Sequence, residues 1–165
     1  MSICKKISIF SLILLTFLTS CTESPHFPVE PHLEYKGISK KNIKQGSLNT
    51  DSLFIYLYFT DGDGDIGIEQ TDSLQNLFII DTRTNKQAES IKIPKIDDAG
   101  IGNGISGEIE LKIYTTCCLF NNNIPPCSVV EGVNTDTLTY KIYLIDRAGN
   151  KSEIIETESI ILECK

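Results

Sequence analysis

Apolar and polar residues alternate with a period of two along much of this 165-residue chain, and this pattern constrains the fold most. In the run 107–114, Ile109, Leu111 and Ile113 share one face and charged residues share the other, as in a half-buried strand. The run 53–60, LFIYLYFT, is apolar on both faces and predicts a central strand. Five further runs predict strands: 32–38, 76–81, 89–93, 136–146 and 156–163. No window carries a helical stripe, so about seven short strands predict an all-β protein, an antiparallel β-sandwich.

One of these runs carries a more specific pattern. In DTLTYKI, residues 136–142, Asp136, Leu138, Tyr140 and Ile142 alternate, and the stretch resembles the tyrosine corner of immunoglobulin-like domains. In that corner, a tyrosine near the start of a strand bonds back to the backbone. Ile142 stands where antibody domains have their second core cysteine, and the chain contains no tryptophan. The resemblance is therefore to immunoglobulin-like sandwiches broadly, and it implies that fold for residues 33–165.

The order of the strands predicts where the loops lie, because successive connections in an antiparallel sandwich alternate between its two ends. The three connections rich in Gly, Asp and Asn, residues 61–72, 95–107 and 146–152, are expected at one end. The connection 115–134 is expected at the other end, where the last strand finishes. Pro94 follows the run 89–93 and predicts that this strand lies at a sheet edge.

The stretch FTDGDGDIG, residues 59–67, places three aspartates at alternate positions directly after a predicted strand. Asp61, Asp63 and Asp65 match positions 1, 3 and 5 of an EF-hand loop, and Asp72 matches position 12. However, Ile66 replaces the required glycine, and a strand leads in where an EF-hand has a helix. The stretch is therefore not an EF-hand, although it shares the alternating ligands of calcium loops.

Two interpretations of this loop remain open, a plain turn and a cation site. Asp-Gly pairs form turns without any metal. Three neighbouring carboxylates nevertheless repel one another, and Arg147 and Lys151 are the nearest cations that could neutralise them. We expect a structural calcium ion, with the ligand set completed from the neighbouring loops. The candidate metal ligands are Asp61, Asp63, Asp65, Asp97, Asp98 and Asp146.

Four cysteines lie in the predicted domain: Cys117, Cys118, Cys127 and Cys164. An even count in an exported chain indicates two disulfides. A bridge between the adjacent Cys117 and Cys118 would be strained, so one of them is expected to pair with Cys127 and the other with Cys164. The alternative, a four-cysteine zinc site, lacks the usual paired spacing.

The N-terminal residues predict export and lipidation. Residues 1–20 combine Lys5 and Lys6 with an uncharged apolar run, as in a secretory signal peptide. The ending Leu-Thr-Ser-Cys resembles a bacterial lipobox and implies a lipid on Cys21, which would anchor the chain to a membrane. The alternatives are an ordinary signal peptide or a short transmembrane anchor. Residues 21–32 contain three prolines and predict an extended tether.

Charge and length limit the classes of function. Cleavage after residue 20 would leave 13 of the 15 basic residues against all 22 acidic ones, a net charge of −9. An acidic chain of this kind is not expected to bind nucleic acid. The remaining residues, 33–165, suffice for one domain with a core.

The lipobox, the opening YKGISKKNIKQG, FTDGDGDIG and DRAGNKS together resemble uncharacterised Bacteroidetes-type lipoproteins with an immunoglobulin- or cadherin-like domain. The resemblance implies a lipid-anchored protein of the cell envelope, at the outer membrane, on either its periplasmic or its surface side. It implies no particular activity.

Catalysis is not expected. The only histidines, His26 and His32, lie in the tether, and Glu108 and Glu110 fall on the solvent face of a strand. We expect a non-catalytic binding module, or alternatively a structural subunit of an envelope assembly. A protein partner is favoured over a glycan, because Phe120 is the only aromatic residue in the loops at the two ends.

Overall fold

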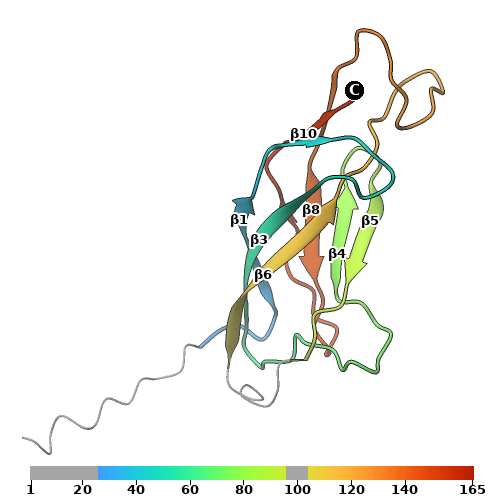
Figure 1. Ribbon diagram of the computed structural model, residues 1–165. Coiled ribbons are helices and arrows are strands. Elements are labelled where there is room, and N and C mark those ends of the chain that lie inside the picture. The colour runs from blue at the N-terminus through green and yellow to red at the C-terminus, as the bar shows by residue number, and fades with distance from the viewer. Residues whose placement is uncertain (1–25, 96–103) are drawn as a thin grey trace, which may run out of the picture.

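The computed structural model describes residues 26–95 and 104–165, and all regular secondary structure in these ranges is β-strand (Figure 1). There are ten strands: β1 (His32–Ile38), β2 (Asn42–Lys44), β3 (Ser52–Asp61), β4 (Leu77–Asp81), β5 (Lys86–Ile91), β6 (Ile105–Tyr114), β7 (Thr135–Leu138), β8 (Tyr140–Leu144), β9 (Ile155–Glu156) and β10 (Ile160–Glu163). They form three small sheets, with the orders β1-β3-β6, β2-β10-β7 and β5-β4-β8-β9. The prediction of an all-β protein is confirmed.

The longest ladder joins β3 to β6 antiparallel over all ten residues, from the Ser52–Tyr114 pair to the Asp61–Ile105 pair. The run predicted as a central strand is indeed the middle strand of its sheet. Its two faces differ, however, because Ile55 and Leu57 are fully enclosed whereas Phe54 on the other face is exposed. Only one face of this sheet is covered by the core.

Two predicted runs are each divided between two sheets. The run 136–146 becomes β7 and β8, which are separated by Thr139. At this point the backbone N–H of Tyr140 donates to the hydroxyl of Thr157 (3.0 Å), so a side chain replaces a ladder bond. The run 156–163 divides in the same way, because β9 pairs with β8 while β10 pairs with β7. The three-residue strand β2, which pairs parallel with β10, was not predicted.

One apolar core joins the three sheets. Its enclosed members include Leu33, Leu57, Ile79, Ile142 and Leu162, which come from five different strands. In Figure 1, β3 and β6 run diagonally in front of β8, and β4 and β5 lie to the right of them. Strand β5 lies at a sheet edge, as Pro94 predicted.

The tyrosine corner is not formed as predicted. Tyr140 is buried, and this burial raises the pKa of its hydroxyl to about 12. Its hydroxyl makes no hydrogen bond within the described residues. Instead, the backbone at Tyr140 is held by the Thr157 hydroxyl, and the backbone carbonyl of Thr139 accepts from the Thr82 hydroxyl (3.0 Å).

The connections that the structure describes separate into two ends, as the strand order predicted, whereas most of the predicted connection 95–107 lies outside the described residues. The connections after β3 and after β8 lie at the lower end of Figure 1, where residues 26–31 also enter. The connection between β6 and β7 lies at the upper end, with Cys164 near it. Residues 1–25 and 96–103, which include the predicted signal peptide and Cys21, lie outside the described residues. Within the described ranges, no helix is long and apolar enough to span a membrane.

Candidate metal centre at the aspartate end

Two of the predicted loops meet and bring four aspartates together. Asp61 is the last residue of β3, Asp63 and Asp65 follow it in the next loop, and Asp146 lies two residues beyond β8. One carboxylate oxygen from each of the four lies within 4.8 Å of the others. This aspartate cluster could hold a metal ion.

Local hydrogen bonds give the first loop its shape. The backbone N–H of Asp65 donates to Oδ2 of Asp61 (2.7 Å) and closes a tight turn. Gly64 within this turn has a φ of 74°, a left-handed conformation that glycine adopts without strain. The alternating Asp-Gly sequence therefore forms a turn that directs three carboxylates to one side.

Backbone groups tie the second loop to the first. The N–H of Ala148 donates to Oδ2 of Asp65 (2.9 Å), and the N–H of Arg147 donates to the carbonyl oxygen of Asp65 (3.3 Å). Asp146 is oriented by Asn150, whose backbone N–H and side-chain amide donate to its two carboxylate oxygens (2.7 and 2.8 Å). The cluster is thus held from both loops by bonds that leave other carboxylate oxygens unused.

Three oxygens in the cluster have no donor. The Oδ1 atoms of Asp61, Asp63 and Asp65 are buried and accept no hydrogen bond from any described residue. Asp61 has an exposed fraction of 0%. Buried polar atoms are almost always paired, so an unpaired set in one place needs an explanation, such as an ion.

The electrostatics agree with the geometry. Burial, followed by the neighbouring charges of Asp63, Asp65 and Asp146, raises the pKa of Asp61 to about 6. The pKa of Asp65 is raised by burial, then by Asp146 and Asp63. Gathering these groups without a cation therefore disfavours their charged forms.

Arg147 and Lys151, the two cations considered in the sequence analysis, form no ion pair with the carboxylates of the cluster. The guanidinium of Arg147 donates to the carbonyl oxygen of Gly67 (2.9 Å), although its charge somewhat lowers the pKa of Asp65. The ammonium of Lys151 lies 3.7 Å from the centre of the Tyr143 ring. The repulsion predicted from the sequence is therefore left largely uncompensated by these two side chains.

None of the remaining residues considered in the sequence analysis is among the four aspartates described above. Asp72 is exposed, and its carboxylate accepts from the backbone N–H of Leu74 (3.0 Å), so it only caps a turn. Asp97 and Asp98 lie outside the described residues. Ile66, at the position where an EF-hand has glycine, is fully buried and anchors the loop in the core.

One supporting residue was missed by sequence reasoning. The buried Asn76 donates from Nδ2 to the carbonyl oxygen of Ile66 (2.6 Å), and its Oδ1 accepts from the backbone N–H of Ile93 (2.8 Å). It holds the base of the aspartate loop against the segment that follows β5. A single asparagine in a loop carries no sequence pattern that reveals this.

The opposite end of the molecule is cross-linked covalently. Disulfides join Cys117 to Cys127 and Cys118 to Cys164. This is one of the two pairings left open by the sequence, and it excludes the zinc alternative for these cysteines. Gln45 supports the arrangement by accepting from the backbone N–H of Cys118 (3.1 Å).

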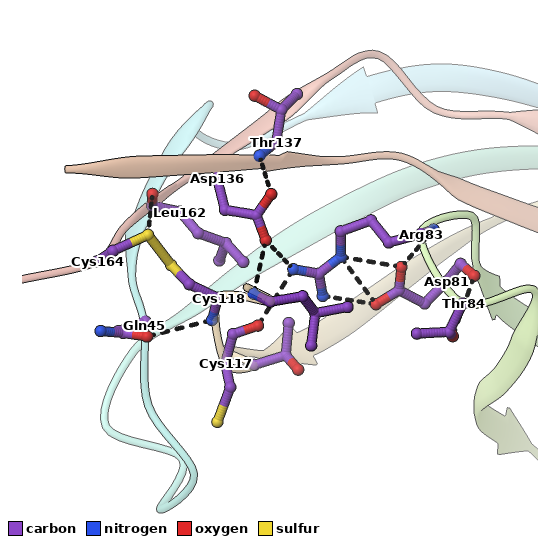
Figure 2. A network of polar contacts seen from close by, with 12 residues as sticks. Gln45, Asp81, Arg83, Thr84, Cys117, Cys118, Asp136, Thr137, Leu162 and Cys164 are labelled. Carbon is purple, nitrogen blue, oxygen red and sulfur yellow. Dashed lines mark hydrogen bonds and ion pairs between the residues drawn. A yellow bond between two sulfur atoms is a disulfide. The ribbon is translucent and has the colours of Figure 1, made fainter. Parts of the chain in front are cut away.

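Beside the disulfides lies a charged network whose carboxylates are neutralised (Figure 2). The guanidinium of Arg83 pairs with Asp81 and with Asp136, both at 2.6 Å. It also donates to the carbonyl oxygen of Cys117 (3.1 Å). Although burial opposes charge here, these two carboxylates raise the pKa of Arg83 further. A cation within the chain therefore neutralises the acidic groups at this end.

Comparison with known proteins gives no relative for this chain: no family model, no curated protein and no solved structure is similar to it.

Proposed function

We propose that this protein is a lipid-anchored, non-catalytic interaction module of the bacterial cell envelope, braced by calcium at the aspartate cluster. The observation that carries the proposal is the set of three buried carboxylate oxygens without a donor, on Asp61, Asp63 and Asp65. A bound cation satisfies all three and removes the repulsion within the cluster.

The chemistry of the ligands favours calcium. Four carboxylates offer hard oxygen atoms only, which suit calcium or magnesium better than zinc, whose protein sites are built mainly from His nitrogen and Cys sulfur with at most some carboxylate oxygens. Calcium takes six to eight oxygens in adaptable geometry, and an Asp-Gly loop supplies them without a rigid octahedral frame. The ion is structural in this proposal, because it sits where two loops need to be joined.

We infer an immunoglobulin-like arrangement for the strands. Strand β8 directly follows β7 in the sequence, and β10 follows β9. Since β7 pairs with β10 and β8 pairs with β9, the four strands can be described as one long antiparallel pair whose two halves belong to different sheets. Strands β1, β3 and β6 would then form the facing sheet. The separation of loops into two ends supports this assignment.

The disulfides indicate an extracytoplasmic protein, because such bonds persist in oxidising compartments. The lipobox-like ending at Cys21 supports a lipid anchor, which the resemblance to Bacteroidetes-type lipoproteins places at the outer membrane. Metabolic labelling with a radioactive fatty acid tests this directly. Wild-type protein should incorporate label and Cys21→Ser should not.

Surface features at the disulfide end support a protein partner. Leu48 and Val129 are largely exposed and border a groove of about 290 Å³ next to Cys127. Phe120, the one aromatic residue of this connection, packs against the core and is not displayed for sugar stacking. An alternative function, a structural subunit of an envelope assembly, would give a stoichiometric partner when the native envelope is solubilised and the protein is captured.

Isothermal titration calorimetry tests the calcium site. The wild-type protein should bind one calcium ion per chain, and Asp63→Asn should abolish the heat of binding. Asp72→Asn is the matched control, because it removes the same charge from the same loop but outside the cluster. Equal binding by Asp63→Asn and Asp72→Asn would contradict the proposed site.

A further inference from the structure

We propose that calcium in the aspartate cluster also controls how the chain that leads to the membrane is seated on the domain. With calcium bound, residues 27–32 pack against the two loops that carry the aspartates. Without calcium, these residues detach from the loops. The inference rests on the calcium site proposed above, but it adds a separate claim about the N-terminal segment.

The first observation is a close approach between that segment and the aspartate loop. Gly62 lies between Asp61 and Asp63, and a Cβ atom placed on it would fall 2.4 Å from the carbonyl oxygen of Phe27 and 2.5 Å from that of Pro28. No side chain fits there without a shift of the backbone. The segment therefore passes directly over the loop that carries three of the four cluster carboxylates, and Figure 1 shows it entering at this end.

A second contact comes from the loop that carries Asp146. The imidazole of His32, the first residue of β1, pairs with the carboxylate of Glu153. His32 also pairs in register with Thr60, the residue before Asp61. Pro31, just before it, is buried. The end of the segment thus contacts both loops that the cluster joins.

The coupling follows from charge. Without a cation, mutual repulsion favours separation of the carboxylates of Asp61, Asp65 and Asp146, and so of the two loops. The segment contacts the first loop at Gly62 and the second at Glu153, so its seat depends on how these two loops lie relative to one another. A cation that holds the loops together must therefore also favour the seated segment, by the same free energy with which seating favours the cation.

The absence of tryptophan from the chain allows a clean test. Phe27 is half-buried against the domain, so Phe27→Trp gives a single fluorophore at the contact. We would measure acrylamide quenching and fluorescence anisotropy of this variant, full length in detergent micelles, with calcium and with chelator. Val129→Trp, at the exposed disulfide end, is the control reporter.

Calcium should lower the quenching constant of the Phe27→Trp variant by roughly twofold and raise its anisotropy, as expected when a locally open segment becomes ordered. The Val129→Trp reporter should not respond, and neither should Phe27→Trp combined with Asp63→Asn. His32→Ala combined with Phe27→Trp removes the ion pair with Glu153 and no cluster carboxylate, so it should keep calcium binding in calorimetry but weaken the fluorescence response.

Two outcomes separate this inference from the proposed function. If calorimetry shows calcium binding while quenching of the Phe27→Trp variant stays unchanged, the coupling is wrong and the calcium site stands. If neither calcium binding nor a fluorescence change is found, both fail. Should Phe27→Trp lower stability, Val29→Trp, on an exposed residue of the same segment, gives the same comparison.

Discussion

The two ends of this molecule gather carboxylates in opposite ways. At the disulfide end, Asp81 and Asp136 share the guanidinium of Arg83, and two covalent bridges fix the chain around them. At the aspartate end, Asp61 and Asp65 face other carboxylates, and three oxygens lack a donor. One end contains its own cation, and the other requires a cation from solution.

Two further carboxyl groups, one near each end, show the same contrast in their pKa values. Near the disulfide end, hydrogen bonds from Lys40, then from the backbone N–H of Lys44, lower the pKa of Asp51 to about 2. At the aspartate end, burial raises the pKa of Asp61 to about 6. The disulfide end is therefore expected to keep its stability in chelator, whereas the aspartate end is expected to depend on metal.

The largest predicted effect concerns the disulfide end. Replacing Cys118 and Cys164 together by alanine should lower the free energy of unfolding by about 4 kcal/mol, because the bridge spans 46 residues. Replacing Cys117 and Cys127, which span 10 residues, should cost about 3 kcal/mol. Urea denaturation of both double variants measures the difference. An equal or reversed order would contradict the loop-length argument.

Removal of the internal cation is expected to have a slightly smaller effect. Arg83→Met keeps the apolar volume but leaves Asp81 and Asp136 without their partner, and should cost about 3 kcal/mol of unfolding free energy. Lys86→Met is the control, because it removes the same charge from an exposed site and should change stability by less than about 0.5 kcal/mol. Similar values for the two variants would show that the network contributes nothing.

A smaller effect is expected from pH at the aspartate end, measured in chelator. The pKa of Asp61 is about 6 in the folded protein against an ordinary 3.8, so the folded state binds its proton more tightly than the unfolded state. The penalty for ionising Asp61 is therefore present above about pH 6, falls as pH decreases towards 3.8, and is absent below that value. Metal-free protein should melt at a higher temperature at pH 5 than at pH 7.5.

Asp61→Asn tests the origin of that pH dependence. The variant has no proton to bind at this position, so its melting temperature in chelator should change less between pH 5 and pH 7.5 than that of the wild type. An unchanged pH dependence would assign the effect to other groups.

The sequence was informative wherever structure follows from local pattern. The alternation of Ile109, Leu111 and Ile113 predicted β6, and the alternation of loop ends predicted that Asp61 and Asp146 would meet. Both features depend on periodicity and chain direction, which a sequence displays directly.

The rest depended on tertiary contacts. The division of the 136–146 run depends on the hydroxyl of Thr157, and the base of the aspartate loop depends on the amide of Asn76. The disulfide pairing also depends on tertiary structure. Cys117 and Cys118 are adjacent in the sequence, and only the folded backbone determines which of them faces Cys127 and which faces Cys164. No spacing in the sequence reveals such contacts.

The most direct test of the central claim is thermal unfolding of the wild-type protein at pH 7.5 in millimolar calcium and in chelator. A ligand that binds only the folded state stabilises it, by about 2.7 kcal/mol at a hundred times its dissociation constant. We predict a clear rise in melting temperature with calcium, and no rise for Asp63→Asn. An identical melting temperature of the wild type in calcium and in chelator would contradict the claim that the aspartate end takes its cation from solution.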